Sequence, residues 1–532
     1  MTDKIKALID NGDIFIGMEL GSTRIKAVVT DNDGNVIASG AHSWENKLEN
    51  GVWIYTAEQI HAGLKACYSD LLNNVKEKYH TVIKNVKAIG ISGMMHGYIA
   101  LDKNKNVLAP FATWRNNITE SEAEYLSSLF EFNIPQRWSI AHLYRAVKNK
   151  EPHLEKIDYL TTLSGYIHYL LTDQKVLGIC EASGMFPIDP LNLDYDRKML
   201  EKFNCLLKEN NLDLKTEDIL PKVLTAGKTA GVLTNDGAAF LDVSGNLKPD
   251  IPLCPPEGDA GTGMVATNSI KPKTGNISAG TSAFAMIVLE KALSKVYKEF
   301  DIVHTPDGNV TVMVHSNNCT TEINSWVALF KEVLKEFNAD ISYDDLYEKL
   351  FNKATKGKND CGGLVAYCFH SGEHLLGLSE GCPMFLHKPD SDFSLANFMR
   401  AQIYSCFGVL KSGMDFLKEK ENVTANKITA HGGIFKTKGV AQDFLAAALN
   451  TPVAVYPSAN EGGAWGIALL AMYLEKSEQM TLGEFLDEII FKNLPTEVAN
   501  PDELTAKGYE AFMKMYNSYL PAEFAAAKVK NN

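Results

Sequence analysis

Residues 16–30 have the sequence IGMELGSTRIKAVVT, and this stretch decides the fold of the first half of the chain. The run 14–19 predicts a buried strand, and Gly21-Ser22-Thr23 predicts a tight turn. Residues 25–30 then predict a second strand. A third strand is expected over 36–39, because the residues before it, Asn-Asp-Gly-Asn, are typical of a hairpin turn. The chain therefore begins with three antiparallel strands.

A helix and a further strand follow this opening. The helix is expected over 56–75, because apolar residues recur at three- and four-residue spacing from Ile60 to Leu71. The strand is expected over 86–91. The resulting order of three strands, a helix and a strand differs from the strand-helix alternation of a dinucleotide-binding fold.

The second half of the chain opens in a similar way. Residues 275–279 predict a strand, Gly280-Thr281-Ser282 a turn, and 283–289 an apolar strand. This similarity indicates a weak internal repeat. We therefore expect an α/β protein with two domains, residues 1–268 and 269–532.

Composition and charge limit the partners of the protein. The formal net charge of −13 disfavours binding to nucleic acid or to an anionic membrane. The longest apolar stretch, 465–474, is shorter than the ~18 residues that a membrane-spanning helix needs. Nine cysteines occur without a C-x-x-C pair, which disfavours a zinc site or a disulfide framework. We expect a cytoplasmic protein.

The two Gly-Ser/Thr turns are candidate phosphate sites. The sequence contains neither G-x-x-x-x-G-K-[ST] nor G-x-G-x-x-G, so the commonest phosphate-binding loops are disfavoured. Backbone N–H groups and hydroxyls can nevertheless point into one concavity at a glycine turn. The alternative for a single turn is an ordinary hairpin. Two such turns facing each other would favour phosphate binding.

Two further glycine-rich segments could carry chemistry. Asp259 lies in the run 258–263, where a carboxylate with little bulk around it could reach both a substrate hydroxyl and a phosphate. The alternative is a structural turn aspartate. His431-Gly432-Gly433 joins a predicted strand to a predicted helix, where a glycine pair permits close approach of a nucleotide. A plain loop is an equally good explanation.

These pieces, in this order, resemble the FGGY family of carbohydrate kinases, with features of its xylulokinase-like branch. The resemblance runs through nearly the whole chain. The matching pieces are residues 16–23, 88–97, Trp114, Ala182-Ser183-Gly184, Asp259-Ala260-Gly261, Gly280-Thr281-Ser282, Ser371-Gly372-Glu373, His431-Gly432-Gly433 and 463–471.

The resemblance implies two ribonuclease-H-like domains of the actin and hexokinase type around a central cleft. It implies that the first domain binds a small-molecule sugar, that the second binds mainly ATP, and that Asp259 is the general base. The implied sugar-binding residues are Met95, His96, Gly97, Asn116 and Asp259, and the implied phosphate- or nucleotide-binding residues are Gly21, Ser22, Thr23, Gly280, Thr281, Ser282, Gly432 and Gly433. For His96, the alternative is a buried histidine whose ring is satisfied by the backbone.

The chain departs from the family pattern at two of these positions. The family usually has an Asp that helps to hold Mg²⁺ where this chain has Glu19, so the implied metal residues are Glu19 and Asp259. The extra methylene adds ~1.5 Å of reach, and a misplacement of ~1 Å can cost ~10²-fold in rate. Many members have an Asp where this chain has Asn116, and an amide binds hydroxyls differently from a carboxylate.

The predicted reaction is transfer of the γ-phosphate of ATP to a hydroxyl of a ketose similar to xylulose, or of a polyol. One alternative is another acceptor such as a sugar acid, for which Arg115 and Arg137 are the candidate cations. A second alternative is an actin-like regulatory ATPase without a sugar acceptor. For the oligomeric state, a homodimer is one option.

Overall fold

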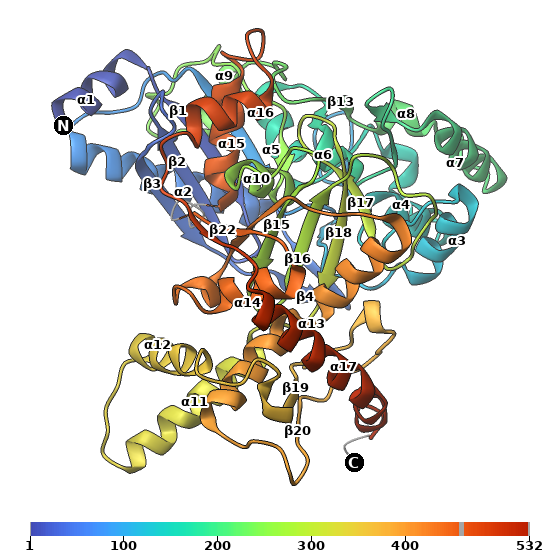
Figure 1. Cartoon of the computed structure of the whole chain (residues 1–532). Helices are drawn as coiled ribbons and strands as arrows, with labels where there is room; N and C mark the ends of the chain where they lie inside the picture. The colour runs from blue at the N-terminus through green and yellow to red at the C-terminus, as the bar shows by residue number, and fades with distance from the viewer. Residues whose placement is uncertain (1, 457–461, 530–532) are drawn as a thin grey trace. The chain divides into compact units, whose positions relative to one another are not determined.

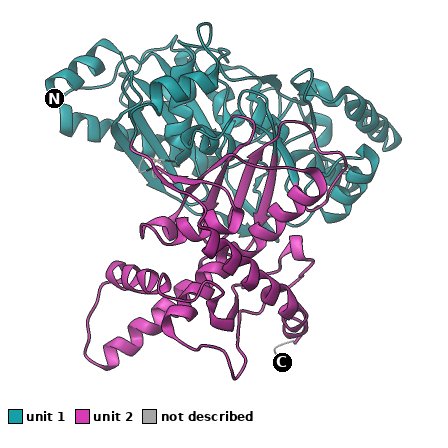
Figure 2. Cartoon of the chain, viewed as in Figure 1, with its two compact units in different colours: residues 1–270, 301–311, 461–494 teal, residues 271–300, 312–460, 495–532 magenta. Residues whose placement is uncertain are grey.

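The computed structural model describes residues 2–456 and 462–529 (Figure 1). The chain divides into two compact units, coloured separately in Figure 2. As far as they are described, residues 1–270, 301–311 and 461–494 form the first unit, and residues 271–300, 312–460 and 495–532 form the second. Each unit is therefore assembled from segments that are distant in the sequence.

The first unit is built on a five-stranded sheet with the order β14-β6-β1-β2-β3. Its strands are β1 (Phe15–Leu20), β2 (Arg24–Thr30), β3 (Val36–Ser43), β6 (Ala88–Gly93) and β14 (Glu257–Gly258). The strands β1, β2 and β3 pair antiparallel, whereas β6 pairs parallel with both β1 and β14. The predicted antiparallel opening and the predicted later strand are confirmed, and the structure adds that this later strand is parallel to β1.

Helix α2 (Ala57–Tyr79) connects the antiparallel strands to β6. It begins with a capping box, in which the Thr56 side chain and the Gln59 side chain each bond the other residue's backbone N–H. This arrangement satisfies two N–H groups that a helix start otherwise leaves without partners. Its buried residues include Ile60, Leu64 and Leu71, as the apolar spacing predicted.

Helix α15 (Gly462–Tyr473) packs directly on strand β1. A Cβ atom on Gly17 of β1 would lie 2.1 Å from the carbonyl oxygen of Ala464. No real Cβ atom tolerates that distance, so helix and strand can approach this closely only because residue 17 is glycine. The contact is backbone against backbone.

Helix α10 (Asp259–Ala266) follows strand β14 and packs against the other side of α15. Here a Cβ atom on Gly466 would lie 2.0 Å from the carbonyl oxygen of Thr262. Gly17 and Gly466 therefore allow both β1 and α10 to pack closely on α15. This packing brings the end of β1 near the start of α10.

The remaining elements of the first unit surround this centre. They are α1 (Thr2–Asn11), β4 (Lys47–Glu49), β5 (Val52–Tyr55), β7 (Ile99–Leu101), β8 (Phe111–Ala112), α3 (Glu120–Phe130), α4 (Ser139–Lys148), β9 (Tyr159–Thr161), α5 (Leu163–Thr172), β10 (Val176–Gly178), α6 (Ile179–Ser183), β11 (Ile188–Asp189), β12 (Asp194–Tyr195), α7 (Arg197–Glu209), α8 (Thr216–Ile219), β13 (Lys222–Leu224), α9 (Asn235–Leu241), β17 (Asp301–His304) and α16 (Leu482–Phe485).

The second unit repeats the arrangement of the first. Strand β15 pairs antiparallel with β16 across a short turn and parallel with β21, as β1 does with β2 and β6. Its sheet continues through β18, β16, β15, β21, β22 and β23. The strands are β15 (Thr274–Ala279), β16 (Ala283–Val288), β18 (Val310–Ser316), β21 (Lys427–His431), β22 (Val453–Val455) and β23 (Glu497–Ala499).

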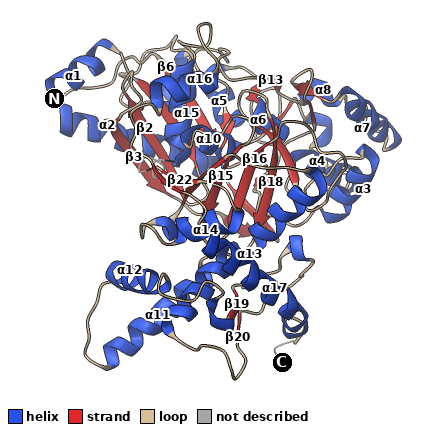
Figure 3. Ribbon diagram, viewed as in Figure 1, coloured by secondary structure: helices blue, strands red, loops and turns tan. Residues whose placement is uncertain are grey.

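Helices make up most of the rest of the second unit, and Figure 3 shows both units as mixtures of helix and strand. Its other elements are α11 (Thr321–Glu336), α12 (Tyr343–Ala354), β19 (Val365–Tyr367), β20 (Met384–Leu386), α13 (Leu395–Glu421), α14 (Ala441–Leu449) and α17 (Glu503–Ala526). The predicted α/β class with two similar halves is confirmed. Among the described residues, no helix combines the length and apolar character needed to cross a membrane.

The glycine in β1 gives a direct test of this packing. We expect Gly17→Ala to lower the free energy of unfolding by about 3 kcal/mol or more, because the added methyl group meets backbone that cannot move aside. Urea unfolding measures the loss. Gly245→Ala is the control: the site has open space but a φ of 71°, so a loss of only about 1 kcal/mol is expected. Equal stability of Gly17→Ala and the wild type would contradict the packing.

Candidate active site

Asp259 is the first residue of α10, directly after strand β14. The backbone N–H of Met95 donates a hydrogen bond of 3.2 Å to its Oδ1 atom. Burial raises the pKa of the Asp259 carboxyl, while the N–H groups of Met95 and Ala260 act in the opposite direction. The structure therefore holds a fixed, partly exposed carboxylate with more affinity for a proton than an ordinary aspartate.

Glu19 lies near the end of β1, opposite Lys26 of β2. The backbone N–H groups of Gly463 and Ala464, in the first turn of α15, donate to its carboxylate. A Cβ atom on Gly463 would lie 2.4 Å from Oε1, so the carboxylate occupies the space that a side chain would fill. The longer side chain of glutamate thus ends at the start of a helix, where negative charge is favoured.

Glu19 and Asp259 interact electrostatically. Burial raises the pKa of Glu19 to about 7, the charge of Lys26 lowers it, and the charge of Asp259 raises it again. Mg²⁺ commonly takes one or two protein carboxylates and completes its shell with water and substrate phosphate. Two neighbouring carboxylates suit that role. Within the described ranges, no group of three or more His, Cys, Asp or Glu side chains could hold a metal ion.

The turn Gly21-Ser22-Thr23 joins β1 to β2 and is held by aromatic side chains. The indole Nε1 of Trp44 donates to the Gly21 carbonyl at 2.7 Å, and the Tyr55 hydroxyl donates to the Ser22 carbonyl. The rings of Trp44 and Tyr55 also stack, with centroids 4.1 Å apart. These donors draw the carbonyl oxygens of the turn to one side and fix its conformation.

Met95, His96 and Gly97 form an unusual loop after strand β6. His96 has a φ of 69° and Gly97 a φ of 92°, and a Cβ atom on Gly97 would lie 2.5 Å from the ring of Phe111. Only glycine fits at position 97 without strain. In this loop the N–H of Met95 donates to Asp259 at the start of α10, whereas the N–H of Gly97 donates to the carbonyl of Arg137.

The His96 ring is oriented by the backbone. Its Nδ1 lies 3.1 Å from the carbonyl oxygen of Gly184, and burial together with the charge of Arg137 lowers the pKa of His96 to about 3. The ring is therefore neutral near pH 7. Because a carbonyl only accepts, Nδ1 carries the proton and Nε2 is left as a hydrogen-bond acceptor.

Asn116 is buried and bonds the backbone of two segments. Its Oδ1 accepts from the N–H of Trp53 at 2.7 Å, and its Nδ2 donates to the carbonyls of Trp53 and Thr113, each at 2.9 Å. Both amide hydrogens are used, and one acceptor lone pair remains. The contact of Asn116 with sugar stays a prediction. In the structure, its side chain braces the segment around Trp53 against the segment around Thr113 by hydrogen bonds to both backbones.

Both arginines considered as clamps for an acidic substrate have other partners. Arg137 forms an ion pair with Asp301 of β17. The guanidinium of Arg115 lies 4.2 Å from the centre of the Trp53 ring and donates to Asn46 at 3.2 Å. Neither charge is left without a partner.

In the second unit, the turn Gly280-Thr281-Ser282 is held by the segment before α11. The Gly280 carbonyl accepts from the N–H and the hydroxyl of Thr320, and the Thr281 carbonyl accepts from the N–H of Cys319. No pattern in the sequence connects 319–320 with this turn. The carbonyls of this turn are thus bonded to their own unit, as are those of the first turn.

Gly432 and Gly433 lie beside this second turn. Ser278 of β15 pairs with His431 of β21, and a Cβ atom on Gly432 would lie 2.0 Å from the carbonyl of Ala279. Gly432 also has a φ of 125°, which L side chains rarely adopt. Gly433 has open space around its Cα. The structure therefore brings 280–282 and 432–433 together at one end of the sheet.

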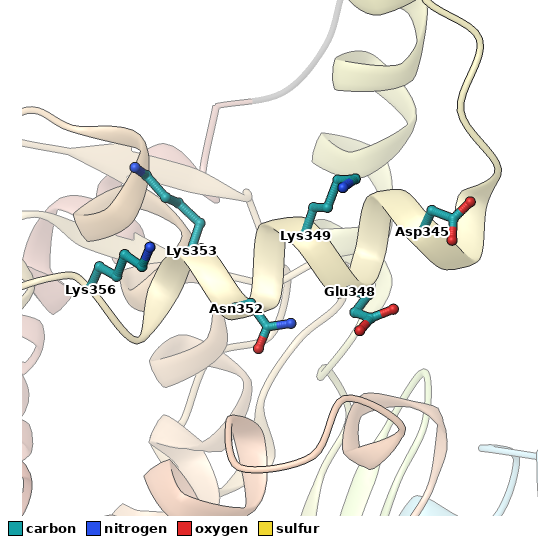
Figure 4. A pocket seen from close by; sticks show the side chains of 6 residues that line it. All are labelled: Asp345, Glu348, Lys349, Asn352, Lys353 and Lys356. Carbon is teal, nitrogen blue, oxygen red and sulfur yellow. The ribbon is translucent and has the colours of Figure 1, made fainter.

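A depression of about 360 Å³ on the second unit involves none of these residues. It is lined by exposed side chains of α12 and the turn that follows it: Asp345, Glu348, Lys349, Asn352, Lys353 and Lys356 (Figure 4). The two acidic side chains lie toward the start of the helix, and the three lysines follow them along the same open face. Such a face is typical of a solvated surface and gives no evidence of a binding site.

Comparison with protein families decides the class of protein. Residues 14–265 match the N-terminal domain of the FGGY family of carbohydrate kinases, and residues 275–475 match its C-terminal domain. The chain belongs to this family. As an FGGY kinase, it is an enzyme that uses ATP to phosphorylate a carbohydrate.

Individual relatives of this FGGY kinase are distant. It is 24% identical to a xylulose kinase of Haemophilus influenzae over 535 residues, covering 95% of this chain and 99% of the relative. A xylulose kinase of Staphylococcus epidermidis is 24% identical over 477 residues, covering 87% and 88%. The resemblance to the xylulokinase-like branch is thus confirmed.

Solved structures agree on the fold of the FGGY kinase. Ligand-bound xylulose kinase from Lactobacillus acidophilus has a TM-score of 0.78 at 16% identity, covering 97% of this chain and 99% of that one. Gluconate kinase from the same organism has a TM-score of 0.76 at 17% identity with the same coverage. Proteins named for a neutral sugar and for a sugar acid therefore share this fold, so the fold alone does not select the substrate.

The bracing role of Asn116 predicts a loss of stability in Asn116→Asp. The carboxylate would face two carbonyls to which the amide now donates. We expect the free energy of unfolding to fall by about 2–4 kcal/mol at neutral pH, and by less in acid, where the protonated carboxyl donates one bond. Urea unfolding at both pH values measures the effect.

Asn74→Asp is the control, because Asn74 donates a single bond to the Ser39 carbonyl at the surface. It should lose about 1 kcal/mol or less. If Asn116→Asp were as stable as this control, the side chain would not brace the two segments.

Proposed function

We propose that this FGGY kinase transfers the γ-phosphate of ATP to a hydroxyl of a neutral ketose similar to xylulose, or of a polyol, with Asp259 as the general base. The observation that carries this proposal is the position of Asp259. It is fixed by the Met95 N–H at the start of α10, and its charge acts on Glu19. The xylulose kinases among the relatives support the choice of a ketose.

The proton transfer follows from the environment of Asp259. Its carboxylate removes the hydroxyl proton as the hydroxyl oxygen bonds to the γ-phosphorus, and the bond from that phosphorus to the bridging oxygen breaks to release ADP. Because burial raises its pKa, Asp259 is a stronger base than an ordinary aspartate. It later passes the proton to solvent. The backbone N–H groups around its carboxylate, including that of Met95, keep it oriented.

The sugar would lie against the loop of Met95, His96 and Gly97. With Nδ1 bonded to the Gly184 carbonyl, the His96 Nε2 can accept a hydrogen bond from a sugar hydroxyl. Arg137, whose charge acts on His96, is neutralised by Asp301. A neutral acceptor therefore suits this region better than a sugar acid.

We assign phosphate binding to the turns Gly21-Ser22-Thr23 and Gly280-Thr281-Ser282, and nucleotide contact to Gly432 and Gly433. Support comes from the open space beside Gly280 and Gly433, which leaves room for a ligand against the backbone, and from turn carbonyls bonded to their own unit. Glu19 and Asp259 would hold Mg²⁺. When bound, that ion neutralises charge on the transferred phosphate.

Asp259→Asn tests the base directly. The amide keeps the shape but cannot accept the proton, so we expect sugar-dependent ADP release to fall by about 10²- to 10⁴-fold. Binding of ATP should change little and is measured separately by titration. Asp102→Asn, in an exposed turn of the same unit, is the control and should retain wild-type turnover. Turnover by Asp259→Asn at the rate of this control would exclude Asp259 as the base.

The class of acceptor is tested with a panel of ketoses, polyols and sugar acids. We expect kcat/KM for the best neutral acceptor to exceed that for the best sugar acid by more than about tenfold. Asp301→Asn removes the ion-pair partner of Arg137. The ratio of kcat/KM for the best neutral acceptor to kcat/KM for the best sugar acid should therefore decrease. If the wild-type enzyme instead has a higher kcat/KM for a sugar acid, the proposed neutral acceptor is wrong and the substrate is a sugar acid.

A further inference from the structure

Glu373, in the piece Ser371-Gly372-Glu373 that matches the family, has no part in the reaction described above. It lies in the second unit and is 1% exposed. A short hairpin fixes its backbone: the Glu373 N–H donates to the Leu378 carbonyl at 2.7 Å, and the Leu378 N–H donates to the Glu373 carbonyl at 3.0 Å. A buried carboxylate is costly unless hydrogen bonds compensate it. The partners of Glu373 therefore indicate its role.

Three donors converge on one oxygen of Glu373. Its Oε1 accepts from the backbone N–H of Asn318 at 2.9 Å, from the Nδ2 of Asn318 at 2.7 Å and from the hydroxyl of Ser316 at 3.1 Å. Asn318 is itself buried. The carboxylate thus holds both the main chain and the side chain of Asn318.

The side chain of Asn318 also binds the residues just before Glu373. Its Oδ1 accepts from the N–H groups of His370 and Ser371, at 2.8 and 2.9 Å, and its Nδ2 donates to the Ser371 carbonyl at 3.0 Å. The Nε2 of His370 in turn lies 2.9 Å from Oε2 of Glu322, in the first turn of α11. One network of hydrogen bonds therefore joins residues 370–373 to the segment that leads into α11.

Asn318 is followed directly by the residues that hold the turn Gly280-Thr281-Ser282. The Cys319 N–H donates to the Thr281 carbonyl at 2.8 Å, and the N–H and the hydroxyl of Thr320 donate to the Gly280 carbonyl at 3.1 and 2.8 Å. Phosphate is bound by N–H groups and hydroxyls and is repelled by carbonyl oxygens. Bonds that occupy these carbonyls therefore favour phosphate binding at the turn.

We propose that Glu373 is a positioning residue for ATP, which fixes Asn318 and, through it, the bonds from 319–320 to the turn Gly280-Thr281-Ser282. Each step of this path is a hydrogen bond or a peptide link within the second unit. Glu373 acts on ATP without touching it. The inference rests on the phosphate binding assigned to this turn in the function proposed above.

Titration with two nucleotide ligands tests the path, because adenosine has the base and the ribose of ATP but no phosphate. In Glu373→Ala, Asn318 loses its acceptor and the turn is no longer held. We expect the affinity for ATP to fall by about 10- to 100-fold. The affinity for adenosine should stay within about twofold of the wild type. A purely structural role would weaken both ligands alike, so an equal loss for the two would overturn the inference.

Glu373→Gln and a matched carboxylate serve as controls. Gln keeps an acceptor at the position of Oε1, so its affinity for ATP should stay within about fivefold of the wild type. Glu421 of the same unit also accepts three bonds, from the N–H and the hydroxyl of Ser294 and from the hydroxyl of Tyr297. None of these partners belongs to the path, so Glu421→Ala should bind ATP as the wild type does. The inference would be overturned if either variant bound ATP as weakly as Glu373→Ala.

Thr320→Val tests the other end of the path, because it removes only the hydroxyl bond to the Gly280 carbonyl. We expect its affinity for ATP to fall by about fivefold. Since both residues act on one turn, the loss in Glu373→Ala/Thr320→Val should be smaller than the product of the two single losses. A loss equal to that product, or wild-type affinity in Thr320→Val, would contradict the path. If Glu373→Ala does not fold, Glu373→Met, which fills a similar volume without an acceptor, replaces it throughout.

Failure of this inference and failure of the proposed function give different results. The affinity for ATP is measured without sugar, so it depends neither on the acceptor nor on the base. If Glu373→Ala bound ATP as tightly as the wild type while Asp259→Asn was inactive, only the inference would fail. If no sugar stimulated ADP release by the wild type, the proposed function would fail, and the binding experiments would still decide the role of Glu373.

Discussion

The contact of α15 with its neighbours, backbone against backbone, is the constraint on which the site depends. Gly17 lets β1 approach this helix, and Gly466 lets α10 approach it. As a result, Glu19 near the end of β1 and Asp259 at the start of α10 come within electrostatic range. Any side chain at either glycine would separate them.

This arrangement removes charged groups from water, which costs free energy. Backbone N–H groups that face the carboxylates offset part of this cost. N–H groups of Gly463 and Ala464 face Glu19, those of Met95 and Ala260 face Asp259, and those of Cys180 and Glu181 face Glu257. Fixed N–H dipoles need no rearrangement during reaction, which is how a preorganised site stabilises charge.

The sequence predicted the parts that depend on local patterns. Strand pairing around residues 16–30, its repetition after Gly275, and a carboxylate at Asp259 followed from turn chemistry, spacing and family resemblance. Glu181 and Glu257, both buried, were missed because no motif marks them and their burial depends on contacts far along the chain. The division at residue 268 remains a proposal, since 301–311 and 461–494 rejoin the first unit through tertiary contacts that a single cut does not represent.

The pH dependence of kcat/KM for the wild-type enzyme tests the central claim most directly. If Asp259 takes the proton beside a carboxylate whose pKa is raised to about 7, then kcat/KM should fall as the pH is lowered below neutrality, because both groups must be ionised. The substrate is the best acceptor from the panel, and phosphorylated sugar is the product measured. A kcat/KM that stays constant down to about pH 4 would contradict the account, since neither carboxylate would then take part.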